Sequence, residues 1–313
     1  MKELVTVAVA TYHSASYVLE TLESVYNQTY KNIALLVSDD CSTDETVSIV
    51  REWVALEKVQ NRFSTIQILT VPKNTGVSAN CNRCVAATQS NWLKFIAGDD
   101  ILLPNCIEDN IAFIVTNPKV NVVFSQVKLF QDNFQEANYI KTTPLNFPNN
   151  LMHESFNAQD QFELLLFCDR IHYTPSLFLN KQAIIKVGGY DETNRLVEDY
   201  PMWLKLTSSG ERLFYFHKET VGYRIHSNAT NNSGLDVLIK PSVINSYLVR
   251  KKYAHSHLPK LLVLQESWVY KTAVIFKKIG ITKKTKFTAQ LYKLSTIYAN
   301  PFFYCNAIYK KLK

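Results

Sequence analysis

Short apolar, β-branched runs alternate with helix-like segments through the first hundred residues. The runs cover residues 4–10, 33–37, 66–71 and 92–97. A continuous apolar run is typical of a strand that is covered on both faces. Between the first two runs, Val18, Leu22 and Val25 recur at helical spacing. Strands that alternate with helices predict an α/β fold, with a mostly parallel central sheet flanked by helices.

Acidic pairs follow two of these predicted strands directly. Asp39-Asp40 ends the second strand, and Asp99-Asp100 ends the fourth. Ligands of parallel α/β sheets gather outside the carboxyl ends of the strands. Because two acidic pairs at one edge are costly when unpaired, the pattern predicts a cation or a polar ligand between them. Ser42 to Glu45 is typical of a capping box at the start of the next helix.

The periodic pattern weakens after Ser125. Residues 126–160 are polar, with no clear period. Further elements are expected at 176–179 (strand), 181–187 (helix), 198–209 (helix) and 221–225 (strand). Beyond about Gly234 the sequence becomes helical, basic and aromatic, and this change predicts a domain boundary there.

Positive charge is concentrated in the last fifth of the chain. From residue 250 onwards there are 14 Lys and Arg and one acidic residue, Glu266, while the whole chain carries a net charge of +7. Lysines mixed with aromatic residues such as Phe287 and Tyr292 suit the surface of an anionic membrane. The alternative is an ordinary helical pair packed on the preceding domain with a solvated basic face. Nucleic-acid binding is not expected, because no recognised module is present.

Several protein classes are disfavoured by what the sequence lacks. The lone Cys81-x-x-Cys84 indicates two small buried residues more than a metal or redox site. No G-x-G-x-x-G follows the first strand, which argues against a dinucleotide-dependent oxidoreductase. No glycine-rich basic loop follows it either, which argues against a nucleotidyltransferase. No segment reaches the ~18–20 apolar residues of a membrane span, so a cytoplasmic protein is expected.

Several segments, taken in order, resemble inverting glycosyltransferase family 2, whose members have the GT-A fold. The resemblance spans roughly residues 4–230 and is carried by VTVAVATYHSASYVLETLESVYNQTYKNIALLVSDDCSTDETVSIV, NTGVSANCN, FIAGDDILLP, VGGYDETNRLVEDYPMWLKL and YRIHSN. It implies a catalytic domain over 1–234, with a nucleotide-sugar half to about residue 125 and an acceptor half over 126–234. A basic helical region over 235–313 follows.

The resemblance implies nucleotide-binding residues after the first, second and fourth strands. Thr11, Tyr12 and Asp40 are expected to hold the base, with the Asp40 carboxylate accepting from an imide N–H such as that of uracil. The adjacent Asp39 is a candidate for the same role. Asp99 is expected to contact the ribose. The alternative for Asp40 is stabilisation of a helix N-terminus.

Gly98-Asp99-Asp100 resembles the family's variant of the DXD motif and implies a Mn²⁺ or Mg²⁺ ion. Asp100 is the expected ligand, and His226 lies where family members often carry a histidine near the metal. A hard cation held by oxygen ligands neutralises the charge of a diphosphate leaving group. Arg224 is expected to pair with a phosphate or with a local carboxylate. Arg83 lies two residues after Cys81, which stands where the family often has arginine.

Glu198-Asp199 resembles the acidic pair that precedes a Trp-bearing helix in the family. Inversion by a single displacement needs one base to deprotonate the acceptor hydroxyl. Asp199 is favoured over Glu198 for this role. Asp191 is a third candidate, although its expected part is to position the loop.

The resulting prediction is a hexosyltransferase similar to bacterial enzymes of O-antigen or capsule assembly. The expected donor is UDP-glucose or UDP-galactose, and the expected acceptor is a saccharide linked to polyprenyl diphosphate. The basic helical region over 235–313 predicts that the enzyme lies at the inner face of the cytoplasmic membrane. Two alternatives remain open: an N-acetylhexosamine donor, and a GT-A protein that binds nucleotide or sugar without catalysis.

Overall fold

The computed structural model describes residues 2–146, 151–195, 197–226 and 237–305. The chain divides into two compact units, residues 1–226 and 227–313. The domain boundary expected near residue 234 lies outside the described residues, so it stays a prediction.

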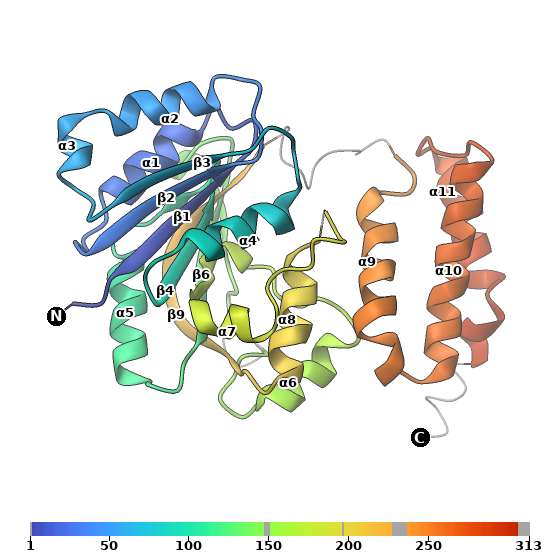
Figure 1. Cartoon of the computed structure of the whole chain (residues 1–313). Helices are drawn as coiled ribbons and strands as arrows, with labels where there is room; N and C mark the ends of the chain where they lie inside the picture. Colours follow the sequence, from blue (N-terminus) through green and yellow to red (C-terminus); the bar gives the residue numbers. More distant parts are fainter. Residues whose placement is uncertain (1, 147–150, 196, 227–236, 306–313) are drawn as a thin grey trace. The chain divides into compact units, whose positions relative to one another are not determined.

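Within the described residues, the first unit contains one nine-stranded mixed sheet with helices packed against it (Figure 1). The strands are β1 (Val5–Thr11), β2 (Ile33–Asp39), β3 (Ile66–Thr70), β4 (Trp92–Ala97), β5 (Ile101–Leu102), β6 (Val122–Gln131), β7 (Tyr139–Thr143), β8 (Phe178–Asn180) and β9 (Leu213–Ile225). Their order is β3-β2-β1-β4-β8-β6-β9-β5, and β7 pairs with β6. The helices are α1 (Val18–Tyr26), α2 (Thr46–Val54), α3 (Glu57–Gln60), α4 (Val77–Ala87), α5 (Cys106–Thr116), α6 (Ala158–Leu165), α7 (Lys181–Lys186) and α8 (Asp199–Ser208).

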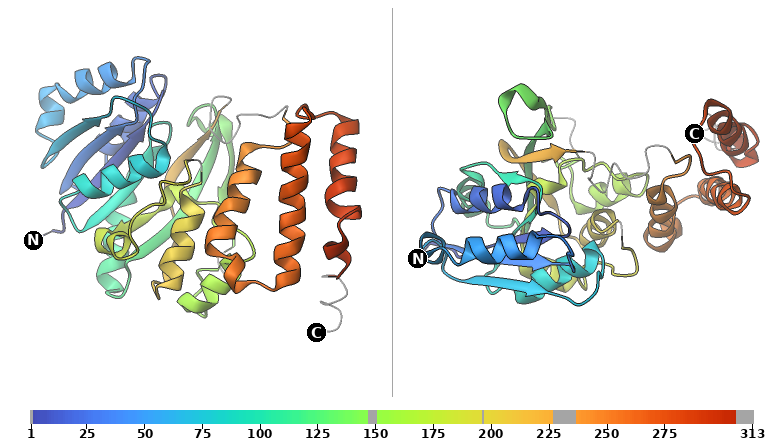
Figure 2. Two further views of the ribbon diagram at one scale, coloured as in Figure 1. Left: turned by 45° about the vertical axis from the view of Figure 1, so that its right-hand side comes forward. Right: turned by 90° about the horizontal axis from the view of Figure 1, so that it is seen from above.

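The first four strands form the parallel part of the sheet, as the sequence predicts. β1 pairs in parallel with β2 and β4, and β2 pairs in parallel with β3. All residues of β2 and nearly all of β1 are buried, which explains their continuous apolar sequences. Because parallel crossovers are right-handed, α1 and α2 lie on one face of the sheet and α4, which runs back to β4, lies on the other. Figure 2 shows helices on both sides of the sheet.

The second half of the sheet is mostly antiparallel and extends the first half through β8. β8 pairs antiparallel with both β4 and β6. β6 and β9 are parallel, with register shifts near Gln126. The structure also places β6, β7 and α6 in the region where the sequence shows no period. β9 begins at Leu213, eight residues before the strand expected at Val221.

The turn after α7 is formed by two glycines. Gly188 and Gly189 have φ angles of +77° and +72°, a region that glycine enters without steric cost. Their backbone N–H groups donate to Ile185 O and Ile184 O, closing the helix end. The chain then leads through a loop to α8, whose first residue is Asp199.

The second unit is helical. Its helices are α9 (Pro241–Tyr253), α10 (Lys260–Lys278) and α11 (Lys286–Lys293), followed by a π-helical segment, Leu294–Tyr298. Ile239, Ala273 and Phe276 form a small buried cluster between them. Across the described residues, none of the helices combines the length and apolar character needed to span a bilayer.

Candidate active site

The carboxyl ends of β1, β2 and β4 lie at one edge of the sheet, because these strands are parallel neighbours. Thr11 ends β1, Asp39 ends β2, and Gly98-Asp99-Asp100 follows β4. Tyr12 is 48% exposed, and its ring stacks on His13 at a centroid distance of 4.1 Å. The fold therefore brings the predicted nucleotide-binding residues to one edge, with an exposed aromatic ring beside them.

The buried carboxylate of Asp39 organises the turn after β2. Its Oδ2 accepts hydrogen bonds from Thr11 Oγ1 at 2.9 Å and Ser42 Oγ at 2.6 Å, and its Oδ1 accepts from Ser42 N at 2.8 Å. Ser42 is thus engaged away from the helix that follows. The N-cap of α2 is Glu45, without a side-chain capping bond, so the predicted capping box from Ser42 to Glu45 is wrong.

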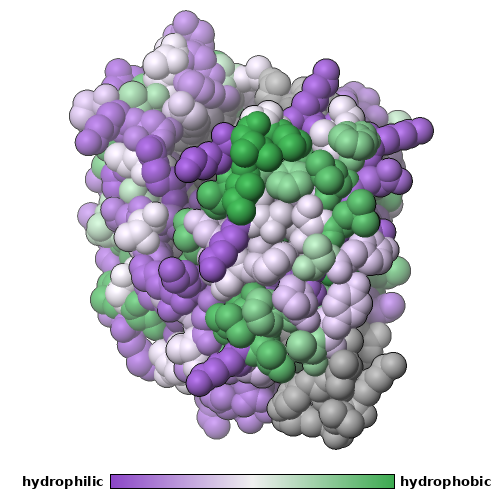
Figure 3. Space-filling view, turned by 90° about the vertical axis from the view of Figure 1, so that its right-hand side faces the viewer, coloured by the Kyte–Doolittle hydropathy of each residue, from purple (hydrophilic) through white to green (hydrophobic). Residues whose placement is uncertain are grey.

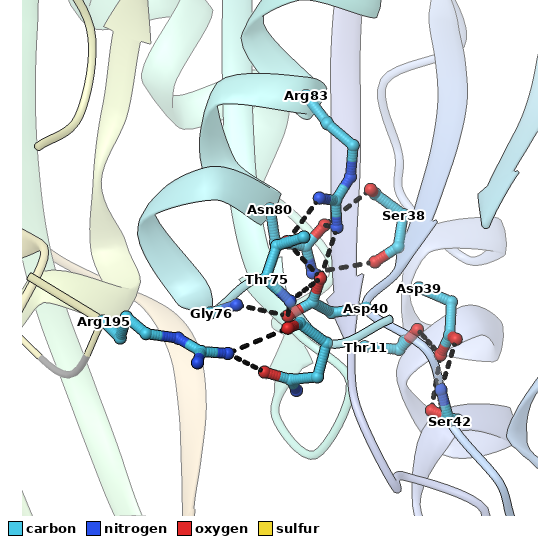
Figure 4. A network of polar contacts seen from close by, with 11 residues as sticks. Thr11, Ser38, Asp39, Asp40, Ser42, Thr75, Gly76, Asn80, Arg83 and Arg195 are labelled. Atoms are coloured by element: carbon cyan, nitrogen blue, oxygen red, sulfur yellow. Dashed lines mark hydrogen bonds and ion pairs between the residues drawn. The ribbon is translucent and has the colours of Figure 1, made fainter. Parts of the chain in front are cut away.

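Asp40 is held by a dense set of donors from the start of α4 (Figure 4). Its carboxylate accepts from Thr75 Oγ1 at 2.5 Å, from Thr75 N at 3.0 and 3.1 Å, and from Gly76 N at 2.7 Å. Arg83 adds an ion pair at 2.8 Å. Burial alone would raise the pKa of Asp40, but the hydrogen bonds from Thr75, Arg83 and Gly76 hold it below the usual value. The side chain is therefore a carboxylate at neutral pH.

The loop between α7 and α8 is fastened to the same turn. Arg195 donates to Asn74 O at 2.9 Å and to Asn74 Oδ1 at 2.7 Å (Figure 4). Ser78 Oγ donates to Asn194 O at 2.8 Å. Asn82 Nδ2 donates to Tyr190 O at 3.0 Å. The loop that leads to Asp199 is thus tied to the loop that holds Asp40.

Asp100 is buried and is approached by Arg224 from β9. The Arg224 backbone N–H donates to Asp100 Oδ1 at 2.9 Å, and the Arg224 Nε donates to Asp99 O at 2.8 Å. The guanidinium also pairs with Glu20 at 2.5 Å and lies over the Tyr17 ring. Of the two expectations for Arg224, the structure shows the local carboxylate.

Asp99 and His226 face one another beside Asp100. His226 Nε2 lies 3.1 Å from Asp99 Oδ2, and the His226 ring packs against Tyr17 at a centroid distance of 4.5 Å. Burial, and after it the charge of Asp99, raise the pKa of Asp100 well above its usual value. Gly98 permits the close approach of this segment to β1, because a Cβ there would meet Thr11 Cγ2 at 2.8 Å.

The donor set around Asp100 fits a divalent cation that is shared with a phosphate ligand. Among the described residues, no group of three or more His, Cys, Asp or Glu side chains is placed to hold a metal ion. Mg²⁺ is commonly held by one or two carboxylates, with phosphate oxygens and water filling the remaining positions. The buried Asp100 carboxylate matches that type of site, because a cation beside it offsets the unfavourable charge of Asp99.

Glu198 and Asp199 lie at the N-terminus of α8, where the helix dipole favours negative charge. Both are half-buried. The Thr174 side chain lies close to Asp199 and lowers the pKa of that carboxyl, against the larger effect of burial. Burial raises the pKa of Glu198 to about 7, and Asp169 contributes to this shift. Burial, and then the charges of Glu198 and Asp169, raise the pKa of Asp199 well above its usual value. The pair is therefore poised to take up a proton near neutral pH.

Asp191 has a local structural part. Its Oδ1 accepts from Thr193 N at 3.1 Å and from Thr193 Oγ1 at 2.7 Å, which fixes the turn before Asn194.

The nearby Cys81 and Cys84 are both buried, and burial raises the pKa of each thiol. This agrees with their interpretation as small packed residues.

Two side chains near the site, Asp169 and Arg195, are not among the candidates that the sequence identifies. Asp169 acts electrostatically on Glu198 and Asp199 from a segment without periodicity, so no pattern marks it. Arg195 bonds Asn74 across 121 residues of sequence, a contact that only the packed fold reveals. Its one sequence signal is its position three residues before the acidic pair.

Sequence comparison relates this chain to known glycosyltransferases. The family model for glycosyl transferase family 2 matches residues 6–188. The chain is 24% identical over 242 residues to the Escherichia coli protein named UDP-Glc:alpha-D-GlcNAc-diphosphoundecaprenol beta-1,3-glucosyltransferase WfaP, covering 77% of this chain and 84% of WfaP.

Solved structures share the fold at low sequence identity. S. aureus TarS 1-349 in complex with UDP-GlcNAc matches with a TM-score of 0.60 and 16% identity, covering 95% of this chain and 82% of that one. A longer TarS chain is covered to 43% of its length. The mannosyltransferase PcManGT from Pyrobaculum calidifontis, in complex with GDP-Man and Mn²⁺, matches with a TM-score of 0.56 and 15% identity over 98% of this chain and 87% of that one. With its GT-A type fold and a family model that matches more than half of its length, this chain belongs to glycosyltransferase family 2.

Proposed function

We propose that this chain transfers a hexose from a UDP-sugar to a hydroxyl of a lipid-linked oligosaccharide, with inversion at the anomeric carbon. The observation that carries the proposal is the set of carboxylates gathered at one sheet edge and at the start of α8: Asp40, Asp99, Asp100, Glu198 and Asp199. WfaP, whose name specifies a UDP-Glc donor and a diphosphoundecaprenol-linked acceptor, supports UDP-glucose and a lipid-linked acceptor. UDP-galactose is the second favoured donor, and synthesis of a bacterial O-antigen or capsule is the proposed setting.

Nucleotide binding is assigned to the ends of β1, β2 and β4. Tyr12 offers an exposed ring for the base, and the ionised Asp40 accepts from the imide N–H of uracil. Thr11 and Asp39 hold this edge in shape through their mutual hydrogen bond of 2.9 Å. Asp99 binds the ribose. A hydrogen-bonded base edge discriminates well, because the wrong base leaves buried polar groups unpaired.

Asp199 is proposed as the general base. Its carboxylate takes the proton of the acceptor hydroxyl, the hydroxyl oxygen forms a bond to the anomeric carbon, and the bond from that carbon to the diphosphate oxygen breaks. UDP departs with the electron pair of the broken bond. Glu198 raises the proton affinity of Asp199 through its charge. A base with a raised pKa takes the proton more readily in the transition state.

A Mn²⁺ or Mg²⁺ ion is proposed as cofactor, with Asp100 and His226 as the residues that would hold it. When bound, the ion supplies positive charge that offsets the negative charge on the departing diphosphate. PcManGT, whose structure contains Mn²⁺, supports a divalent metal. Arg224 keeps Asp100 in place through its backbone N–H.

The C-terminal unit is proposed to bind the anionic lipid surface at the inner face of the cytoplasmic membrane. Exposed apolar side chains lie among exposed lysines on its surface, and Figure 3 shows such patches side by side. The apolar set is Ile275, Ile279, Phe287, Leu294 and Tyr298, and the basic set is Lys277, Lys278, Lys283, Lys284, Lys286 and Lys293. Apolar side chains at the headgroup level and lysines near anionic lipids both favour surface binding.

Turnover with a panel of donors tests the proposal. The full chain is incubated with UDP-glucose, UDP-galactose, UDP-GlcNAc or UDP-GalNAc, Mn²⁺, and a GlcNAc diphosphate that carries a decyl chain. We expect a β-linked hexosyl product from one of the first two donors. Preference for an N-acetylated donor, an alternative that the TarS complex with UDP-GlcNAc favours, replaces the hexose assignment. An α-linked product contradicts inversion, and UDP binding without any turnover favours the inactive alternative.

A further inference from the structure

A cavity of about 540 Å³ lies in the second half of the first unit, in the part of the sequence without periodicity. Cavities of ~300–1,000 Å³ are typical of small-molecule sites. The cavity wall includes Pro144, Phe156 and Tyr173, and its polar groups include Asp169, Arg170 and His172. An apolar and aromatic wall with a few placed polar groups is the usual composition of a small-molecule site.

The charged groups of the cavity are available to a ligand. Arg170 and His172 are exposed, and Arg170 forms no ion pair with a described residue. A guanidinium binds phosphate through paired hydrogen bonds. Asp169 is also exposed to the cavity, yet protein surrounds it enough that burial raises the pKa of its carboxyl. The cavity thus presents a guanidinium, an imidazole and a carboxylate.

The cavity adjoins the proposed base through the chain itself. Tyr173 lines the cavity, and the next residue, Thr174, is close enough to Asp199 to lower the pKa of its carboxyl against the larger effect of burial. Tyr200, which follows Asp199, donates from its hydroxyl to Leu165 O at 2.6 Å, beside the cavity residue Leu164. The start of α8, which carries the proposed base, is therefore hydrogen-bonded to the helix that lines the cavity.

We infer that this cavity is the acceptor site and that it takes a saccharide joined to a phosphate or diphosphate. Arg170 and His172 bind the phosphate, and Asp169 accepts a hydrogen bond from a hydroxyl of the sugar that receives the hexose. The aromatic wall covers an apolar face of that sugar. The inference deepens the proposed function, on which it rests, by assigning acceptor contacts to named residues.

Binding of two acceptor probes to the UDP-saturated full chain, measured by calorimetry, tests the inference. One probe is decyl-diphospho-GlcNAc, and the other is decyl GlcNAc without phosphate. We expect Arg170→Ala to weaken the diphosphate probe by about tenfold or more, because a charge-assisted contact is lost. The same variant should leave the neutral probe within about twofold. Asp169→Asn should weaken both probes, because each presents the same sugar hydroxyls.

The controls separate the acceptor site from the donor site. Arg51→Ala removes an exposed arginine of α2 outside the cavity and should change neither probe. UDP affinity should be unchanged in every variant. Equal binding of the diphosphate probe by wild type and Arg170→Ala, with UDP binding intact, would overturn the cavity assignment while leaving the proposed function standing. Failure of the wild type to bind UDP would overturn both.

Discussion

Among single residues, Asp199 at the start of α8 is the one on which the proposed proton transfer depends. Asp199→Asn keeps the shape of the side chain but removes its ability to accept a proton. We expect kcat to fall by roughly 10²–10⁴-fold, the usual contribution of a general base. The Kd for UDP should stay unchanged, because no nucleotide contact is assigned to Asp199. Initial rates and calorimetry on the same preparation check both points, and a variant with near-normal kcat would remove Asp199 from the mechanism.

Glu198 is predicted to set the pH at which Asp199, the proposed base, is ionised. A carboxylate base is active when ionised, so activity falls as pH drops through its pKa in the folded enzyme. The charge of Glu198, after burial, raises the pKa of Asp199, with Asp169 adding to the effect. Glu198→Gln should therefore move the acid limb of the kcat/KM profile to lower pH. A limb that stays in place would show that Glu198 does not tune the base.

The ion pair between Arg83 and Asp40 contributes to stability as well as to the site. The two side chains are 22% and 4% exposed, respectively. Arg83→Met should lower the free energy of unfolding at pH 7 by roughly 1–3 kcal/mol, because Asp40 keeps its bonds from Thr75 and Gly76 but loses its counter-charge. Lys58→Met, which breaks the exposed pair with Glu23, should cost under about 0.5 kcal/mol.

The pH dependence of this effect has a definite sign. The pKa of Asp40 in the folded chain lies below its usual value, so the contribution of the carboxylate is present above about pH 4 and is lost as pH falls through the folded pKa. Denaturant melts at pH 7 and at low pH measure the difference. A gap between wild type and Arg83→Met that widens at low pH would contradict the assignment.

At the scale of elements, the turn into α4 depends on Gly76. Its φ is +93°, and an added Cβ would lie 3.1 Å from Arg195 Cβ. Gly76→Ala should strain the backbone by about 1–3 kcal/mol and also disturb the Gly76 N–H bond to Asp40. Gly210→Ala is the matched control, with φ +90° and no atom within 4 Å of the added Cβ. We expect both variants to lose stability and only Gly76→Ala to lose UDP affinity; equal UDP affinity in the two would contradict a role for this turn in nucleotide binding.

Sequence patterns identify the first half of the fold better than the second. β1 to β4 are buried on both faces or bounded by clear turns, so their apolar runs reveal them. β7 has mainly exposed residues, and the polar stretch His217–Glu219 interrupts β9, so neither strand shows the expected pattern in full. Their pairing with β6 and its register shifts arise from tertiary contacts.

Sequence patterns likewise reveal some residues of the candidate site and miss the contacts of others. The acidic pairs are visible because they follow buried strands or precede a helix. Arg83 and Arg224 are candidates from the sequence, but their pairing with Asp40 and Asp100 is not visible in it, because each arginine reaches its partner from a distant segment. Asp169 and the cavity around it come from a segment whose fold no periodicity predicts.

At the scale of the whole molecule, the C-terminal unit carries the proposed membrane contact. Replacing Lys283, Lys284 and Lys286 with Glu in the full chain should reduce binding to vesicles with anionic lipid by about 3 kcal/mol or more, since each lysine near such a surface contributes about 1 kcal/mol. A triple variant of exposed lysines in the catalytic unit, Lys31, Lys58 and Lys119, should bind like the wild type. Flotation at low and high salt measures both, and equal loss in the two variants would indicate a non-specific charge effect.

The central claim is that the Asp99-Asp100 edge forms a metal-assisted site for a UDP-sugar. The most direct measurement is calorimetry of UDP binding with and without Mn²⁺, on the wild type, Asp100→Asn and Asp199→Asn. The account predicts tight binding that needs Mn²⁺, its loss in Asp100→Asn, and its retention in Asp199→Asn. Binding that ignores Mn²⁺ and survives in Asp100→Asn would contradict the metal site, and no binding of UDP to the wild type would contradict the choice of nucleotide.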